Sequence, residues 1–168
     1  MSDGDLSDQA EVILTVDSVN DAPVLEAISD ITFDEDQIDN ISLLGSDVDN
    51  EELIYSIVGG VNIVSMIENN QVTFTAPSNF NGSESFTAIV SDGELSDSQS
   101  FTVTVIAVND APIATIGLSG NANEDQSVVV SLSASDIDED NLTFSITEGA
   151  DITASLSGSD ITFSAPDD

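Results

Sequence analysis

The sequence predicts an all-β chain built from tandem β-sandwich units, and three observations support this prediction. Apolar residues recur at every second position, which is the spacing of side chains on one face of a strand. Turn-forming residues interrupt these runs about every ten residues, as in SNFNG at 78–82. The sequence also repeats itself at an offset of 89 residues, so one building block occurs more than once.

The internal repeat becomes visible when the sequence is shifted along itself by 89 residues. Residues 1–79 then align with residues 90–168 without a gap, with roughly 30 identities among the 79 pairs. The motif VNDAP at 19–23 recurs at 108–112, and all four prolines fall into two matched pairs. The identities are thus ordered motifs rather than shared composition.

The repeat divides the chain into three expected parts. Residues 1–20 correspond to the last strand of a preceding repeat, residues 21–109 to a complete repeat, and residues 110–168 to the first five strands of an incomplete one. A unit of 89 residues is the size of a small sandwich domain.

The strands within each unit follow from the alternation of apolar and polar residues. The predicted strands carry the inward sets Leu53, Tyr55 and Ile57; Val72, Phe74 and Ala76; Phe86, Ala88 and Val90; Phe101, Val103 and Val105; and Leu142, Phe144 and Ile146, which repeats the first set. No stretch shows the spacing of an amphipathic helix. Together with the turns, these runs predict seven short strands per unit.

The composition restricts the functions that the chain can have. It contains 33 acidic residues and no Lys, Arg, His or Cys, which gives a formal net charge of -33. Nucleic acids and anionic membrane surfaces are therefore unfavourable partners, whereas metal ions are favourable ones. Without His, Lys, Arg or Cys, acid–base and nucleophilic catalysis could use only carboxylates, Ser, Thr and one Tyr. No acidic pair is distinguished from the repeated loop positions, so we expect no enzymatic activity. The apolar stretches are too short for a transmembrane segment.

The two VNDAP motifs lie at junctions between units, where Pro suits a strand start and Asn and Asp suit a turn. Taken alone, the motif is equally well explained as a linker turn. The repeat also retains acidic positions just outside the strands: Asp47 with Asp136, Asp49 with Asp138, Glu35 with Glu124, Asp36 with Asp125, and Asp3 with Asp92. Loops gather at the ends of a sandwich, so these oxygens can form the shell of six to eight ligands that Ca²⁺ prefers.

These motifs together resemble the cadherin-like tandem repeats of large bacterial surface proteins and adhesins. The resemblance rests on SVNDAP and AVNDAP, on the Asp-x-Asp loops in SDVDNEELIYSI and SDIDEDNLTFSI, and on IVSDGELSDSQSFTVTVIAVNDAP, and it covers the whole chain. It implies a Greek-key sandwich of the cadherin or immunoglobulin type and an extracellular location at the cell surface. It also implies calcium ions between consecutive units, which stiffen the string of units into a structural or adhesive rod or filament.

The resemblance implies a set of calcium ligands at each junction. The junction near residue 21 would use Asn20, Asp21, Asp47, Asp49 and Asp92. The junction near residue 110 would use Glu35, Asp36, Asn109, Asp110, Asp136 and Asp138. Two departures from animal cadherins imply one or two ions per junction rather than three. Ser18 and Ala107 replace an acidic residue before the linker, and the neutral SNFNG replaces an acidic cluster.

An EF-hand is the competing calcium site for the two Asp-x-Asp loops. That motif requires Gly at its sixth position and Glu at its twelfth, between two helices. The first loop has Glu52 and Val58 at these positions, and the second has Asn141 and Thr147. The EF-hand interpretation therefore fails.

Two further hypotheses concern partners. A ligand-binding adhesin module for a glycan or a protein is the alternative function, but nearly all aromatic residues have inward strand positions, and only Phe80 lacks one. The second hypothesis is a head-to-tail homo-oligomer formed by strand addition. In it, LSDQAEVILTVDSVND of one molecule would complete the C-terminal unit of another, with Val12, Leu14 and Val16 facing inward and Asp3 close to the second calcium site.

Overall fold

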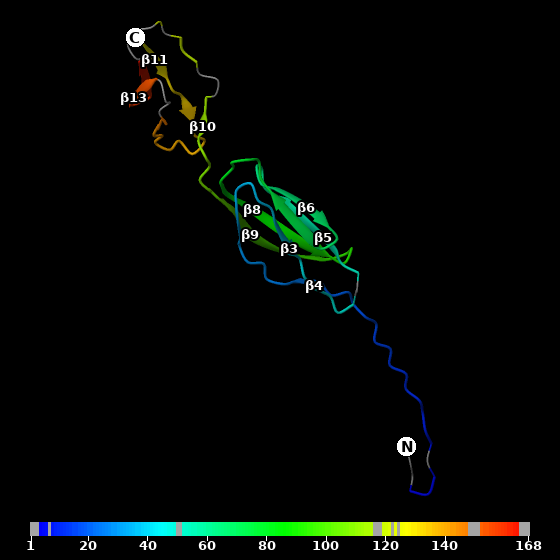
Figure 1. The fold of residues 1–168 in the computed structure, drawn as a ribbon. Helices are drawn as coiled ribbons and strands as arrows, with labels where there is room; N and C mark the ends of the chain where they lie inside the picture. The colour runs from blue at the N-terminus through cyan, green and yellow to red at the C-terminus, as the bar shows by residue number, and fades with distance from the viewer. Residues whose placement is uncertain are drawn as a thin grey trace.

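The computed structural model describes residues 4–6, 8–49, 52–115, 119–121, 123, 125–147 and 152–164. All regular structure in these residues is β-strand, which confirms the predicted all-β class. The strands fall into two groups that follow one another end to end, and an extended segment precedes them at the N-terminus (Figure 1). In the part of the chain described here, no helix is long and apolar enough to cross a membrane.

The first group holds nine strands. They are β1 (Val24–Leu25), β2 (Ile31–Asp34), β3 (Asp39–Ser42), β4 (Gly45–Ser46), β5 (Ile54–Gly59), β6 (Val64–Glu68), β7 (Gln71–Thr75), β8 (Gly82–Ser91) and β9 (Ser96–Ile106). One sheet has the order β2-β9-β8-β5, the other has the order β3-β7-β6, and β1 pairs with β4. The β2–β9 pair is parallel, and the other pairs of this group are antiparallel.

The structure assigns nine strands where the sequence predicts seven, because two segments change partners along their length. The segment that starts as β1 pairs with β4 and then, as β2, with β9. The segment that starts as β3 pairs with β7 and then, as β4, with β1. Each change of partner interrupts the ladder of hydrogen bonds, so one expected strand appears as two short ones.

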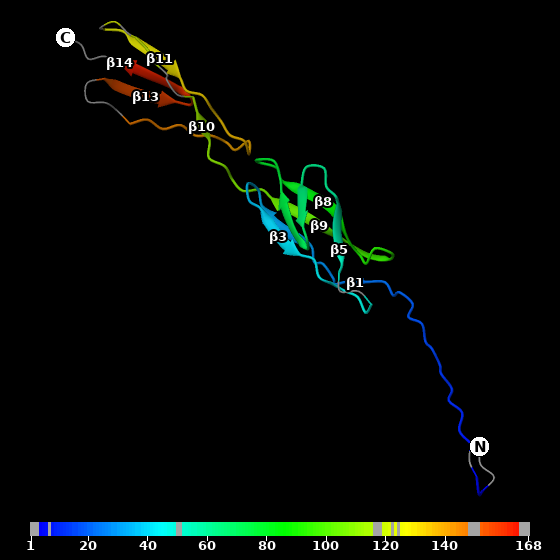
Figure 2. The same cartoon turned by 90° about the vertical axis from the view of Figure 1, so that its right-hand side faces the viewer.

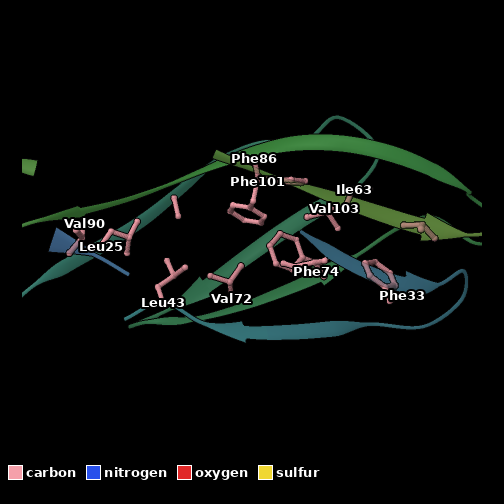
Figure 3. Packing of buried hydrophobic residues seen from close by; sticks show 13 residues of the cluster. Leu25, Phe33, Leu43, Ile63, Val72, Phe74, Phe86, Val90, Phe101 and Val103 are labelled. Carbon is pink, nitrogen blue, oxygen red and sulfur yellow. The ribbon is translucent and has the colours of Figure 1, made fainter. Parts of the chain in front are cut away.

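The core lies between the two sheets and is filled by the alternating apolar residues (Figure 3). Phe74 from one sheet meets Phe86 and Phe101 from the other. The ring centroids of Phe74 and Phe86 are 5.2 Å apart at 76°, an edge-to-face arrangement that aromatic pairs favour. Pro23, directly before β1, is also fully buried. The inward positions predicted from the alternation are therefore confirmed for this group.

A carboxylate closes the turn between β5 and β6. Glu84 of β8 accepts hydrogen bonds from the backbone N–H groups of Val61 (2.7 Å), Asn62 (3.0 Å) and Ile63 (3.0 Å), and from the Asn62 side-chain amide (2.9 Å). Partial burial opposes ionisation of Glu84, but these hydrogen bonds outweigh it and lower its pKa to about 2. Glu84 thus fixes a turn whose backbone donors would otherwise need water.

The second group has five strands. They are β10 (Ile113–Ala114), β11 (Ser127–Ser131), β12 (Ala134–Ser135), β13 (Thr153–Ser157) and β14 (Asp160–Ser164). The order β11-β14-β13 and the pair β10–β12 reproduce the arrangement of β3-β7-β6 and β1–β4 in the first group. The same chain segments therefore form the same pairs in both groups. Figure 2 shows β11, β14 and β13 side by side in the second group.

Two predicted strands are not assigned. The run with Leu142, Phe144 and Ile146 is irregular, and so are residues 8–20, which should be the last strand of a preceding unit. A strand requires a neighbour for its backbone hydrogen bonds. The corresponding strand β5 has β8 as its neighbour, and the described residues of the second group contain no counterpart of β8. The alternation alone was therefore an insufficient predictor, and the domain limits stay predictions.

Candidate metal centre

The two Asp-x-Asp loops fold in the same way after the short strands β4 and β12. The Oδ1 atom of Asp47 accepts a hydrogen bond from the N–H of Asp49 (2.7 Å), and Oδ1 of Asp136 accepts one from the N–H of Asp138 (3.0 Å). Such bonds from an Asp side chain to the backbone two residues on are typical of Asx turns. The first Asp of each loop therefore fixes the loop, and the second is presented to the linker.

The second Asp of each loop then holds the linker that enters the unit. Oδ2 of Asp49 accepts a hydrogen bond from the N–H of Asp21 (2.8 Å). Oδ2 of Asp138 accepts one from the N–H of Asp110 (2.6 Å). The side chain of each linker Asp is thereby placed beside a second carboxylate, at corresponding positions of the two junctions.

Glu35 brings a third carboxylate to the junction near residue 110, from the first group of strands. It follows β2 directly, and its N–H donates to the carbonyl of Ile106 at the end of β9 (2.9 Å). Its Oε1 atom accepts a hydrogen bond from the N–H of Val108 in the linker (2.6 Å). Glu35 is only 5% exposed, which is exceptional for a glutamate in a protein without cationic side chains.

Glu35, Asp110 and Asp138 together form an acidic cluster, with one oxygen from each lying within 4.8 Å of the other two. The cluster lies where the chain passes from β9 to β10 (Figure 1). Oxygens that bind the same Ca²⁺ at about 2.3–2.6 Å must lie within about 5 Å of one another. The spacing of the three carboxylates therefore suits a shared calcium ion.

The electrostatics of Asp110 also favour a bound cation. Burial raises the pKa of its carboxyl group, and repulsion from Asp138, Asp36, Glu35 and Asp136 raises it further. Its Oδ2 atom is buried without a hydrogen-bond partner. A buried, unpaired oxygen among like charges is costly, and a divalent cation removes both costs at once. The residues present thus fit a metal ion.

The other residues predicted for this junction do not belong to the cluster of Glu35, Asp110 and Asp138. Asp36 adopts a left-handed backbone (φ 59°), and its Oδ1 atom accepts a hydrogen bond from the N–H of Asn79 (3.2 Å). Asp136 supports the loop, and both Asp36 and Asp136 are close enough to act on the charge of Asp110. The amide of Asn109 donates to the backbone carbonyl of Asp110 (3.0 Å), so it serves the linker turn.

The junction near residue 21 has the same Asp-x-Asp loop, bound in the same way to its linker Asp, but different neighbouring residues. The amide of Asn20 donates to Oδ2 of Asp92 (2.8 Å). Hydrogen bonds from the N–H of Leu95, from Asn20 and from the N–H of Glu94 lower the pKa of Asp92. Among the residues that the structure describes, no third carboxylate joins Asp21 and Asp49 in a cluster like that around Asp110. At this junction the predicted residues thus form hydrogen-bonded pairs, Asp21 with Asp49 and Asn20 with Asp92, but not one cluster of three carboxylates among the described residues.

Sequence reasoning missed one acidic residue at this end of the unit. Oδ2 of Asp97 accepts a hydrogen bond from the N–H of Leu25 in β1 (2.9 Å). Its identity with Asp8 in the two SDG-x-LSD motifs was the signal that could have identified it. Two predicted positions, Asp3 and Glu124, lie outside the described residues.

Comparison with solved structures returns proteins of low sequence identity and low structural similarity. The EC1-2 fragment of human protocadherin-24 aligns at 17% identity and a TM-score of 0.46, covering 88% of this chain and 79% of the fragment. An endo-fucoidan hydrolase from glycoside hydrolase family 107 aligns at 19% identity and a TM-score of 0.41, covering 87% of this chain and 24% of that one. An I-band fragment of titin aligns at 13% identity and a TM-score of 0.35, covering 84% of this chain and 54% of that one.

The present chain thus spans about a quarter of the hydrolase and about half of the titin fragment. Such low values carry no functional information about this chain. A search of curated proteins finds no match. Comparison with protein families gives a clear result, because residues 20–105, about half of the chain, match the family of bacterial Ig domains. The chain therefore belongs to the bacterial Ig domain family.

Proposed function

We propose that the chain is a calcium-stiffened structural or adhesive segment of an extracellular surface protein. The observation that supports this proposal is the cluster of Glu35, Asp110 and Asp138, which belong to the first strand group, the linker and the second strand group. A cation bound by all three would join the two strand groups through the linker. Bacterial Ig domains serve as modules of surface proteins, which fits a structural or adhesive role.

Glu35 would connect the ion to the backbone of the linker. Because its Oε1 atom accepts the N–H of Val108 while its own N–H donates to Ile106, Glu35 already fixes the exit of β9. Without a cation, mutual repulsion of the carboxylates favours separation of Glu35 from Asp110 and Asp138. With the cation bound, the attraction of each carboxylate for the ion favours one relative orientation of the two groups.

Calcium is the cation that the donor set suits best. All available ligands are oxygens, and the chain has no His or Cys, which zinc and other transition metals prefer. Asp138 is exposed and Asp110 half-buried, so the site is accessible to solvent. We therefore expect an affinity in the range of extracellular modules, with a dissociation constant of about 10⁻⁴–10⁻³ M. Such a site would be filled where calcium is abundant, which supports an extracellular location.

The alternative of a ligand-binding adhesin module has no supporting observation. Phe80, the aromatic residue without a predicted strand position, packs against the buried core. Among the described residues, no Phe or Tyr belongs to the exposed large hydrophobic side chains. Aromatic anchors, which usually dominate the energy of a binding surface, are therefore not displayed in that part of the chain.

A calcium titration by calorimetry tests the proposal, with Asp138→Asn as the variant and Asp49→Asn as its control. The two residues accept the same hydrogen bond from a linker Asp, but only Asp138 belongs to the three-carboxylate cluster. We expect Asp138→Asn to weaken the calcium site at least about tenfold, and Asp49→Asn to leave that site unchanged. Absence of calcium binding at 10 mM, or equal effects of the two substitutions, would contradict the proposal.

A further inference from the structure

A groove opens between two neighbouring segments of the first strand group. β1 pairs with β4, and their ladder ends at the hydrogen bond from the N–H of Glu26 to the carbonyl of Leu44 (2.8 Å). Beyond this point, the chain continues into β2, which joins β9 of one sheet, whereas β3 joins β7 of the other sheet. The separation leaves a groove of about 370 Å³ between residues 26–32 and β3. Both β2 and β3 are edge strands of their sheets.

The edge of β3 directs backbone groups towards this groove. The N–H of Leu43, directly after β3, donates to the carbonyl of Asn70 on the β7 side (2.8 Å), and alternate residues of an antiparallel strand face opposite neighbours. Ser42 therefore faces away from β7, as does Leu44, whose carbonyl accepts the N–H of Glu26. In the described part of the chain, no backbone group pairs with Ser42 on this side. Such an edge is a template for a further strand.

The groove combines apolar and acidic side chains. Ile28 and Ile41 line it and pack against the hydrophobic core. Its lining also includes three carboxylates, those of Glu26, Asp30 and Asp39. Oδ1 of Asp30 accepts the N–H of Thr102 (2.8 Å), and Oδ1 of Asp39 accepts the N–H of Asn40 (2.7 Å), so two of the three are held in position.

We propose that this groove binds an extended segment of another protein that contains Lys or Arg, and that the segment adds to β3 as a further strand. Its backbone would pair with Ser42 and continue, antiparallel to β3, the ladder that ends at Glu26 and Leu44. Apolar side chains of the segment would contact Ile28 and Ile41, and cationic ones would pair with the carboxylates. Strand addition does not require aromatic anchors, because main-chain hydrogen bonds provide the affinity.

The charges of the groove identify the kind of occupant. A second copy of this chain does not fit, because it has no Lys, Arg or His and would bring further carboxylates to those already present. A basic segment removes this repulsion and is also attracted from a distance by the net charge of -33. The groove shares no residue with the cluster of Glu35, Asp110 and Asp138, so its occupation does not depend on calcium.

Nuclear magnetic resonance of the ¹⁵N-labelled protein tests the proposal, with a short peptide of alternating Lys and Val as the probe. The measurement is made in chelator and at about 0.15 M salt, which screens attraction to exposed loops. We expect saturating peptide to slow hydrogen exchange at the N–H of Ser42 at least about tenfold, because this group gains an acceptor. The N–H of Leu43, which already donates to Asn70, is the internal reference.

Two controls separate strand addition from a general attraction of charges. The first is the same peptide with every backbone nitrogen methylated, which keeps its charges and removes its N–H donors. The second is the pair Asp39→Asn and Asp34→Asn, because both carboxylates lie on edge strands and only Asp39 lines the groove. We expect the methylated peptide to leave Ser42 unprotected. Asp39→Asn should weaken binding at least about threefold, and Asp34→Asn should change it less.

Three results would overturn the proposal. They are an unchanged Ser42 up to millimolar peptide, equal protection by the methylated peptide, and equal effects of the two substitutions. Because the measurement is made in chelator, each of these results leaves the proposed function untouched. Conversely, a failed calcium titration leaves the groove untouched.

Discussion

At the scale of single residues, the carboxylates of this chain have opposite environments. Glu84 has a lowered pKa because hydrogen-bond donors surround it, whereas Asp110 has a raised pKa because of burial and four acidic neighbours. The chain offers no basic side chain to balance Asp110. The ionised form of Asp110 therefore stabilises the native state only when a cation is bound, and otherwise destabilises it.

The first prediction at this scale is that Asp110→Asn has opposite effects with and without calcium. A raised native pKa means that the contribution of the group is most favourable below its unfolded pKa and is lost as the pH rises through the native pKa. At neutral pH in chelator, the substitution removes a repelled charge and should raise the melting temperature. In excess calcium it removes a ligand and should lower the melting temperature relative to wild type.

Differential scanning fluorimetry in both buffers, at matched ionic strength, checks this reversal. Asp21→Asn provides the control, because Asp21 holds the same position at the other junction but does not belong to the acidic cluster. If Asp110→Asn changes the melting temperature in the same direction in both buffers, Asp110 is not both a destabilising charge in chelator and a ligand of the calcium ion.

At the scale of the elements, alternating apolar residues predicted a strand correctly where a neighbouring strand pairs with it. The strands around Phe74, Phe86 and Phe101 were predictable, because their apolar residues alternate and each has a neighbouring strand. Residues 141–147 have the same alternation, but the structure assigns no strand to them. The β3–β4 and β1–β2 breaks were not predictable either, because alternation does not show which sheet a strand joins.

The candidate site, too, was predictable only in part. The repeat identified the acidic loops, since each keeps the same spacing and hydrogen bonds to its own linker. The sequence did not show that Glu35 would be buried, because its burial depends on the contact between β2, β9 and the linker. It also did not show that, among the described residues, three carboxylates gather at only one of the two junctions. Glu84 gave no signal at all, because its role depends on the β5–β6 turn that folds against it.

The β5–β6 turn gives the prediction at this scale. Replacing Glu84 by Gln removes the negative acceptor of three backbone N–H groups, so the free energy of unfolding at neutral pH should fall by about 1–2 kcal/mol, reduced by solvent screening at this half-exposed position. Glu68→Gln, at an exposed glutamate on β6, should change it by less than about 0.5 kcal/mol.

The pH dependence of this difference follows from the pKa shift. The native pKa of Glu84 is lowered from 4.5 to about 2, so its contribution is complete above pH 4.5 and is lost as the pH falls towards 2. Urea unfolding of wild type and Glu84→Gln should therefore give a stability difference that narrows across this range. A difference that stays constant from pH 6 to pH 2.5 would exclude the carboxylate as its source.

At the scale of the whole molecule, the carboxylates are concentrated in loops and the sheet faces are largely uncharged. The outward side chains in the middle of β8 and β9 are Ser85, Thr87 and Ile89, and Ser98, Ser100 and Thr102. Most acidic residues in the described part of the chain thus lie in the loops, the linkers and the N-terminal segment. Repulsion at the linker between the two strand groups is therefore the force that a calcium ion would have to overcome.

In the proposed function, a bound calcium ion fixes the second strand group relative to the first. Since the chain contains no cysteine, Ser98→Cys on β9 and Ser155→Cys on β13 provide two unique sites for spin labels, both exposed and neither belonging to the acidic cluster. Pulsed electron paramagnetic resonance then measures the distance between the two labels directly, with labelled protein diluted into unlabelled protein so that only distances within one molecule are observed.

In calcium, we expect a single narrow distance distribution, and in chelator a broad one. Adding Asp138→Asn to the labelled protein should keep the distribution broad at calcium concentrations that saturate the unsubstituted site. If the distribution has the same width in calcium and in chelator, the two groups are not fixed by a metal ion, and the account of this chain as a calcium-stiffened segment is wrong.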